Sequence, residues 1–141
     1  MRILARATTL SPRARRTVGL VGALPLVAAA GFQVALWRGA PYGDAVLGGR
    51  APTVDGVLAT PYRWAALGQG GLLVAMAAVL VRAGSPGPRR AVGTVAGLMA
   101  LNTVANVTSP HPLERRMGAA TLLAALCGAG LAAQREPGLR V

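Results

Sequence analysis

The feature that most constrains this chain is a set of four uncharged, mainly apolar runs. The runs cover residues 17–37, 64–81, 91–110 and 117–134, with lengths of 21, 18, 20 and 18 residues. A bilayer core of about 30 Å needs about 20 apolar residues in a helix. Backbone groups in lipid must be hydrogen-bonded within the protein, so each run should be helical. The sequence therefore predicts an all-α, antiparallel bundle of four transmembrane helices, the third covering 91–109.

The composition agrees with a membrane protein. Hydrophobic residues make up 53% of the chain and charged residues only 13%, whereas soluble domains carry about 25% charged residues. The net charge of +11 is a property that nucleic-acid-binding proteins share. Here, however, the arginines lie between the apolar runs and do not mix with aromatic residues. We therefore expect the lipid bilayer, and no nucleic acid, as a partner.

The distribution of arginine predicts the orientation. With the N-terminus inside, the inner segments hold ten arginines and the outer segments five, as the positive-inside rule requires. Four aromatic residues flank the outer ends of the first two helices, as in an interfacial belt: Trp37, Tyr42, Tyr62 and Trp64. We expect a multi-pass protein of the cytoplasmic membrane, with a basic cytoplasmic segment 1–16, a membrane domain 17–134 and a cytoplasmic tail 135–141.

The first run has an alternative interpretation as a cleaved signal peptide. A basic segment precedes it, and Ala28-Ala29-Ala30 resembles a cleavage site. The apolar stretch continues to Trp37, however, which favours an anchored helix.

The loops differ in kind. The segment 82–90 is rich in Gly and Pro, which predicts a short turn and an antiparallel second and third helix. The outer loop 38–63 has 26 residues, and a structureless connection of that length is uncommon. We expect it to fold over the outer mouth of the bundle, with turns at Gly48-Gly49 and Asp55-Gly56.

Polar side chains recur at a similar depth in the predicted helices. The amides among them are Gln33, Gln69, Asn102 and Asn106, and Thr121 lies at the same level of the fourth helix. Such groups usually face the bundle interior and hydrogen-bond across helices. One interpretation is an interhelical clamp, and the other is the floor of an outward-facing pocket for a small polar molecule. The four runs contain no ionisable acid or base, so they lack the usual carriers of a proton or ion relay.

A second group of polar residues lies on the predicted outer side. It comprises Asp44, Asp55, Arg63, His111, Glu114 and Arg115. His111 and Glu114 are spaced i, i+3, so their side chains can share a metal on one face of a helix. The two aspartates would complete an oxygen-rich site. The alternative is structural, because Pro112 and Glu114 are typical of the first turn of a helix. Glu114 would then cap backbone amides or pair with an arginine.

Small residues suggest close helix contacts. Gly93-x-x-x-Gly97 in the third run is the motif that lets two membrane helices approach closely. We expect it to pack within the chain, while homodimerisation through this face stays open. The single cysteine, Cys127, excludes an intramolecular disulfide. We find no phosphate-binding glycine loop, catalytic triad or metalloprotease motif, and we expect no catalytic residue, metal or cofactor.

Several short motifs occur together in and around the loops. They are Gly39-Ala40-Pro41-Tyr42-Gly43, Gly48-Gly49, Gly56-Val57-Leu58, Pro61, Arg63, Arg82-Ala83-Gly84, Asn106-Val107-Thr108-Ser109-Pro110 and Glu114-Arg115. In these motifs the chain resembles an actinobacterial family of small four-helix integral membrane proteins. The resemblance covers about residues 32–134. The chain departs from the family pattern at His111, where a small polar residue is expected, and at Ala119, where a proline is common.

The family has no assigned activity, so the resemblance implies topology and localisation without a mechanism. It also implies that the outer loop and Glu114-Arg115 form one unit. We expect Glu114 to bond an outer arginine or loop amides and so to hold the loop down. For function, we expect a structural or accessory protein of a membrane complex, with a homo-oligomer or another membrane protein as partner. The alternatives are small-solute binding or transport through the amide layer, and an outer-face metal-dependent enzyme.

Overall fold

The computed structural model describes residues 10–83 and 89–134. The predictions for the remaining residues lie outside this described part. They concern most of the basic segment 1–16, the centre of the turn 82–90 and the tail 135–141.

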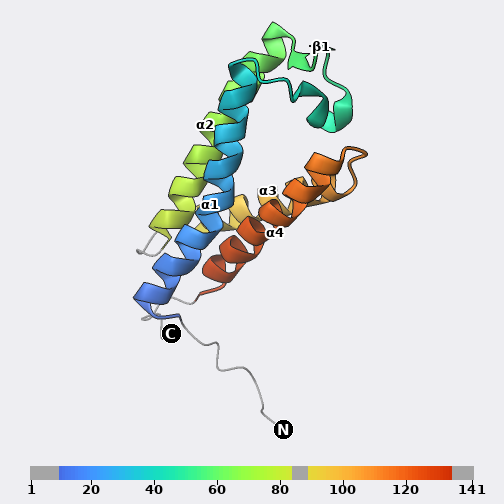
Figure 1. Cartoon of the computed structure of the whole chain (residues 1–141). Coiled ribbons are helices and arrows are strands. Elements are labelled where there is room, and N and C mark those ends of the chain that lie inside the picture. The colour runs from blue at the N-terminus through green and yellow to red at the C-terminus, as the bar shows by residue number, and fades with distance from the viewer. Residues whose placement is uncertain (1–9, 84–88, 135–141) are drawn as a thin grey trace.

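The structure confirms four helices, and the described chain is nearly all α (Figure 1). They are α1 (Pro12–Trp37), α2 (Thr60–Arg82), α3 (Arg89–Val107) and α4 (Pro112–Ala132). Each begins before the uncharged run that predicted it, because N-terminal signals lie in the flanking residues. At α1 the Ser11 side chain accepts from the Ala14 amide at 3.2 Å, and at α4 His111 Nδ1 accepts from the Leu113 amide at 3.2 Å. In both helices proline follows the cap, as expected for the first helical position.

Two of the four helices, α1 and α2, are long and apolar enough to cross a membrane. The other two are richer in small and polar residues. Asn102 and Asn106 lie in α3, and Glu114, Arg115 and Arg116 lie in the first turns of α4. The helical part of the predicted architecture is thus confirmed, together with two apolar helices of membrane length.

The helices form two antiparallel hairpins. α1 packs against α2 along its length, α3 packs against α4, and α4 joins the hairpins by packing on α1. The α3–α4 hairpin crosses the first one obliquely and diverges from it toward the loop end (Figure 1). At the opposite end the Leu10 amide donates to Gln134 Oε1 at 2.8 Å, and Arg89 Nη2 donates to the Ala132 carbonyl at 2.6 Å. The two ends of the described chain therefore lie on the same side of the molecule.

The main core lies where α1 contacts its neighbours, and glycines allow the closest contacts. The side chain of Leu80 is fully buried. A Cβ at Gly19 would overlap the carbonyl oxygen of Leu80, and one at Gly22 would lie 2.7 Å from the Cβ of Cys127. These glycines therefore set the separation of α1 from α2 and α4.

Gly93 and Gly97 make no close helix contact within the described residues. A Cβ at either position would meet no atom within 4 Å. The motif predicts a strip on α3 that lacks side chains, but it does not predict which way this strip faces. In the structure the strip faces away from the other described helices.

The loop between α1 and α2, predicted to lie on the outer side, is folded. Two short 3-10 turns, Gly43–Ala45 and Leu47–Gly49, precede an antiparallel pair of strands, β1 (Thr53–Val54) and β2 (Val57–Leu58). The strands are joined at Asp55 and Gly56, whose φ values of 52° and 76° suit the tight hairpin turn that Asp-Gly favours. A second apolar cluster of Leu36, Ala51, Leu58 and Ala66 fixes the loop on the ends of α1 and α2.

A candidate binding cleft between the hairpins

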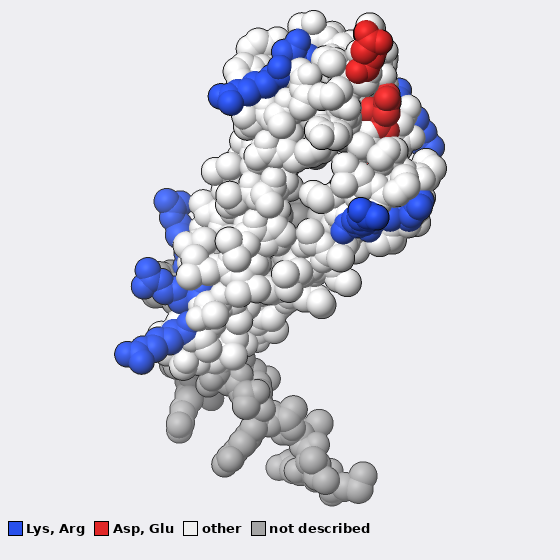
Figure 2. Space-filling view, viewed as in Figure 1, with Lys and Arg blue, Asp and Glu red and all other residues white. Residues whose placement is uncertain are grey.

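Because the hairpins diverge, a cleft of about 770 Å³ lies between them at the loop end. We call it the interhairpin cleft. The 3-10 turns of the loop roof it through Ala45, Val46, Leu47 and Gly48. Figure 2 shows an opening between the loop end and the α3–α4 hairpin. Its apolar wall includes Leu26, Phe32, Leu36, Leu73, Leu113 and Met117. This volume is within the range of about 300–1,000 Å³ that small-molecule sites occupy.

All four amides of the predicted polar layer line the interhairpin cleft. They come from three helices: Gln33 from α1, Gln69 from α2, and Asn102 and Asn106 from α3. Gln69 is exposed and the other three are half-buried. None of the four side chains makes a hydrogen bond within residues 10–83 and 89–134, and that part holds no buried polar side-chain atom without a partner. The amide groups therefore face open space, which leaves their donors and acceptors available to a ligand.

The interhelical clamp is formed by hydroxyls instead of amides. Thr103 Oγ1 donates to Thr121 Oγ1 at 2.9 Å, which joins α3 to α4. Thr121 is buried, and its hydroxyl also contacts the Gly118 carbonyl at 3.0 Å. The polar layer predicted from the sequence includes Thr121 but not Thr103, because threonine is common in apolar helices and is a weak signal by itself.

Glu114 joins α4 to the loop at the mouth of the cleft. Both of its carboxylate oxygens accept from the Gly48 amide, at 3.1 Å each, and Oε2 also accepts from the Ser109 hydroxyl. The expected contact with a loop amide is thus confirmed, while the alternative pairing with arginine is not the contact observed. Gly48 has a φ of 64°, a conformation that glycine adopts without a Cβ penalty. We call this contact the Glu114 latch.

The other polar residues of the outer side do not join the latch in one site. Asp44 accepts from the Thr53 hydroxyl at 2.6 Å within the loop. His111 caps α4 with its Nδ1, and Asp55 lies in the exposed strand turn. In the described ranges no three His, Cys, Asp or Glu residues gather in a way that could hold a metal. These four side chains thus have separate structural surroundings, and the metal-dependent alternative gains no support from the geometry.

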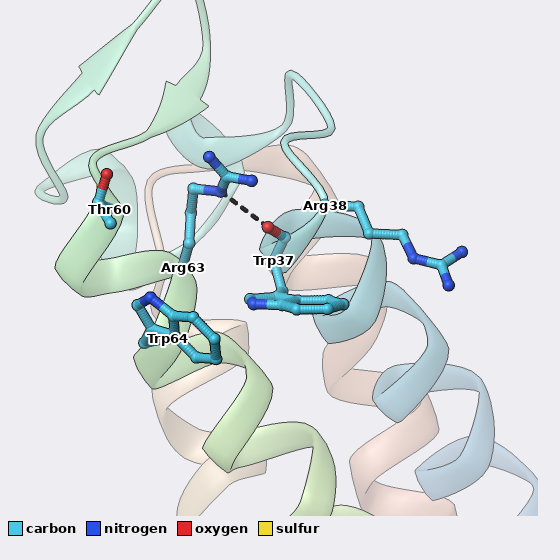
Figure 3. Close-up of a pocket in the computed structure, with 5 residues that line it drawn as sticks. All are labelled: Trp37, Arg38, Thr60, Arg63 and Trp64. Atoms are coloured by element: carbon cyan, nitrogen blue, oxygen red, sulfur yellow. Dashed lines mark hydrogen bonds between the residues drawn. The ribbon is translucent and has the colours of Figure 1, made fainter.

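The two arginines of the outer group cap carbonyl oxygens. Arg115 Nη1 donates to the carbonyls of Ser109 and Pro110 at 3.0 and 2.8 Å. Arg63 Nε donates to the carbonyl of Trp37 at 2.7 Å (Figure 3). Each guanidinium therefore stabilises a chain reversal next to a helix end, where cations are favoured near free carbonyls.

No family model, curated protein or solved structure matches this chain.

Proposed function

We propose that this chain is a small integral membrane protein that binds a small molecule in the interhairpin cleft, from the outer side of the cytoplasmic membrane. In this proposal all four helices span the bilayer and both ends of the chain are cytoplasmic. The observation that carries the binding role is the convergence of four amides from three helices on one cleft of about 770 Å³.

The distribution of charge supports the membrane placement. In Figure 2 an uncharged surface runs obliquely across the described chain, between the charged side chains on one flank and those of the loop end and the other flank. Large apolar side chains of the helices face outward, including Leu24 at 68% exposed, Leu101 at 70% and Leu126 at 62%. Extended exposed apolar patches are rare on soluble monomers. Lipid would cover these side chains, while the amides point inward.

The lining of the cleft indicates the class of ligand. Its charged groups, Arg50 and Glu114, come from the loop and the first turn of α4, and Glu114 is engaged in the latch. Below them the polar groups are neutral amides and hydroxyls, and the wall is apolar. Burying an unpaired charge there would be costly. The cleft therefore suits a neutral molecule with an apolar body and several hydrogen-bonding groups.

Cysteine accessibility tests this proposal. In a Cys127→Ala background, a cysteine at Asn106 should react with a membrane-impermeant methanethiosulfonate added to the outside of oriented vesicles. A cysteine at Leu101 is the control, because it is on the same helix but faces away from the cleft. We expect the Asn106 position to react faster by about an order of magnitude, since the attacking nucleophile is the thiolate, which forms only where the thiol is hydrated. An unreactive Asn106 position would contradict an open cleft, equal reaction at Leu101 would contradict the membrane placement, and reaction only from inside would reverse the orientation.

A second candidate function is the accessory role, in which α3 packs against a second copy of this chain. The observation that favours it is the open strip at Gly93 and Gly97, because close approach at such a strip drives helix association in lipid. Replacing Gly97 with leucine should reduce energy transfer between labelled copies in vesicles. Gly130→Leu is the matched control, as Gly130 is equally open but on α4. Unchanged transfer in the Gly97 variant would remove this role.

A further inference from the structure

A second hollow lies at the loop end of α1 and α2. It has a volume of about 330 Å³ and is lined by Trp37, Arg38, Thr60, Arg63 and Trp64. We call it the tryptophan notch (Figure 3). None of these five residues lines the interhairpin cleft, so the notch is a separate site.

Arg63 is held in place above the two indole rings. Its Nε donates to the Trp37 carbonyl at 2.7 Å, which fixes the guanidinium between the helices. Its two Nη groups make no hydrogen bond within the described residues and stay available. Arg38 is exposed at the rim, with its side chain directed away from the rings (Figure 3). A fixed guanidinium with open N–H groups is well suited to a phosphate oxygen pair.

The rest of the notch fits the same ligand. The indole rings of Trp37 and Trp64 are 5.8 Å apart at 59°, and Trp64 is 58% exposed. Tryptophan favours the headgroup level of a bilayer, where its ring contacts lipid and its N–H can donate. Thr60 adds a hydroxyl at the start of α2, where the helix dipole is positive. No acidic residue lines the notch.

We propose that the tryptophan notch binds a phosphate group at the outer membrane surface, with Arg63 as the anchor and the indoles covering the adjoining apolar part. The phosphate could belong to an anionic phospholipid or be free in solution, and the two sources share this recognition chemistry. The inference rests on the membrane placement proposed above but not on the interhairpin cleft.

Tryptophan fluorescence provides a direct test, because both tryptophans of the chain lie in the notch. The full chain would be reconstituted into phosphatidylcholine vesicles with a fixed fraction of brominated phosphatidylglycerol or brominated phosphatidylcholine. We expect quenching to report about fivefold preference for the anionic lipid, the size that one arginine at an anionic surface supports. Arg63→Gln should abolish the preference. Arg38→Gln, which removes no described hydrogen bond, should reduce it without a folding defect.

The matched control is Arg50→Gln, which removes the same charge from the loop between α1 and α2, outside the notch. An equal loss in Arg50→Gln and Arg63→Gln would overturn the proposal in favour of general surface charge, as would equal quenching by both lipids in the native chain. Inorganic phosphate added to the buffer separates the sources: relief of quenching assigns the notch to free phosphate, and persistence assigns it to lipid. No quenching by either lipid would instead overturn the membrane placement, and the notch with it.

Discussion

Replacing Gly19 with alanine is expected to lower the free energy of unfolding by about 1–3 kcal/mol, the usual range for an overpacked core. The new Cβ would overlap the carbonyl oxygen of Leu80. This oxygen belongs to the backbone of α2, so it cannot rotate away as a flexible side chain would. The hairpin of α1 and α2 would have to separate at this level and lose packing around the buried Leu80 side chain. Unfolding of the purified chain in mixed micelles, followed by helical circular dichroism, would measure the change.

Gly31→Ala is the matched control for this prediction. Gly31 lies in the same helix, but its Cβ would meet no atom within 4 Å. Alanine is favoured over glycine in a helix by about 1 kcal/mol, so this variant should be as stable as the native chain or slightly more stable. The same substitution should thus have opposite signs at two positions of α1. If both variants were destabilised equally, the close contact between α1 and α2 would be refuted.

The number of helices could be predicted from the sequence because charge marks the edges of each apolar run. Arginines at positions 16, 38, 63, 82, 90 and 116 bound these runs, and the observed helices contain nearly all of the predicted residues. The exact ends could not be predicted from charge, because a helix continues through charged residues until a cap such as Ser11 or His111. Charged residues mark where the chain leaves an apolar environment, whereas caps mark where the backbone hydrogen bonds of a helix begin or end.

The directions of helix faces could not be predicted. Gly19 and Gly93 look alike in the sequence, yet one lies against a backbone carbonyl and the other faces open space. All four helices carry apolar residues around their circumference, so the pattern does not distinguish a face that contacts another helix from one that does not. The oblique crossing of the hairpins opens the cleft. Because this crossing depends on the same contacts, it could not be predicted from the sequence either.

The candidate site could be predicted in part. Amides in apolar helices usually face other helices, which predicts that Gln33, Gln69 and Asn106 surround one space, and all three line the cleft. It could not tell a clamp from a pocket, since that depends on whether the helices approach within hydrogen-bond distance. The latch combines Gly48 with Glu114, which are 66 residues apart, and only the folded loop brings them together.

Replacing Glu114 with alanine is expected to release the roof of the cleft. The variant loses the acceptor for the Gly48 amide and the Ser109 hydroxyl, and a hydrogen bond to a charged group contributes about 1.5–3 kcal/mol. The 3-10 turns would then open more often. Because Arg50 is exposed next to these turns, trypsin cleavage between Arg50 and Ala51 should accelerate by about tenfold or more, as cleavage follows the population of the open form. Mass spectrometry of fragments from the solubilised chain would measure the rate at this bond.

Asp55→Asn is the control for the lost charge. It removes a carboxylate from the same loop, at an exposed turn with a φ of 52° that asparagine tolerates, and should leave the cleavage rate unchanged. The second apolar cluster still holds the loop through Leu58 and Ala66 in both variants, so the Glu114 variant should open locally while the helices stay intact. Equal cleavage rates in native, Glu114→Ala and Asp55→Asn chains would mean that apolar packing alone holds the roof. A faster rate in the Glu114 variant alone would instead make this carboxylate the control point for entry into the interhairpin cleft, because it is the contact from α4 that keeps Gly48 over the mouth.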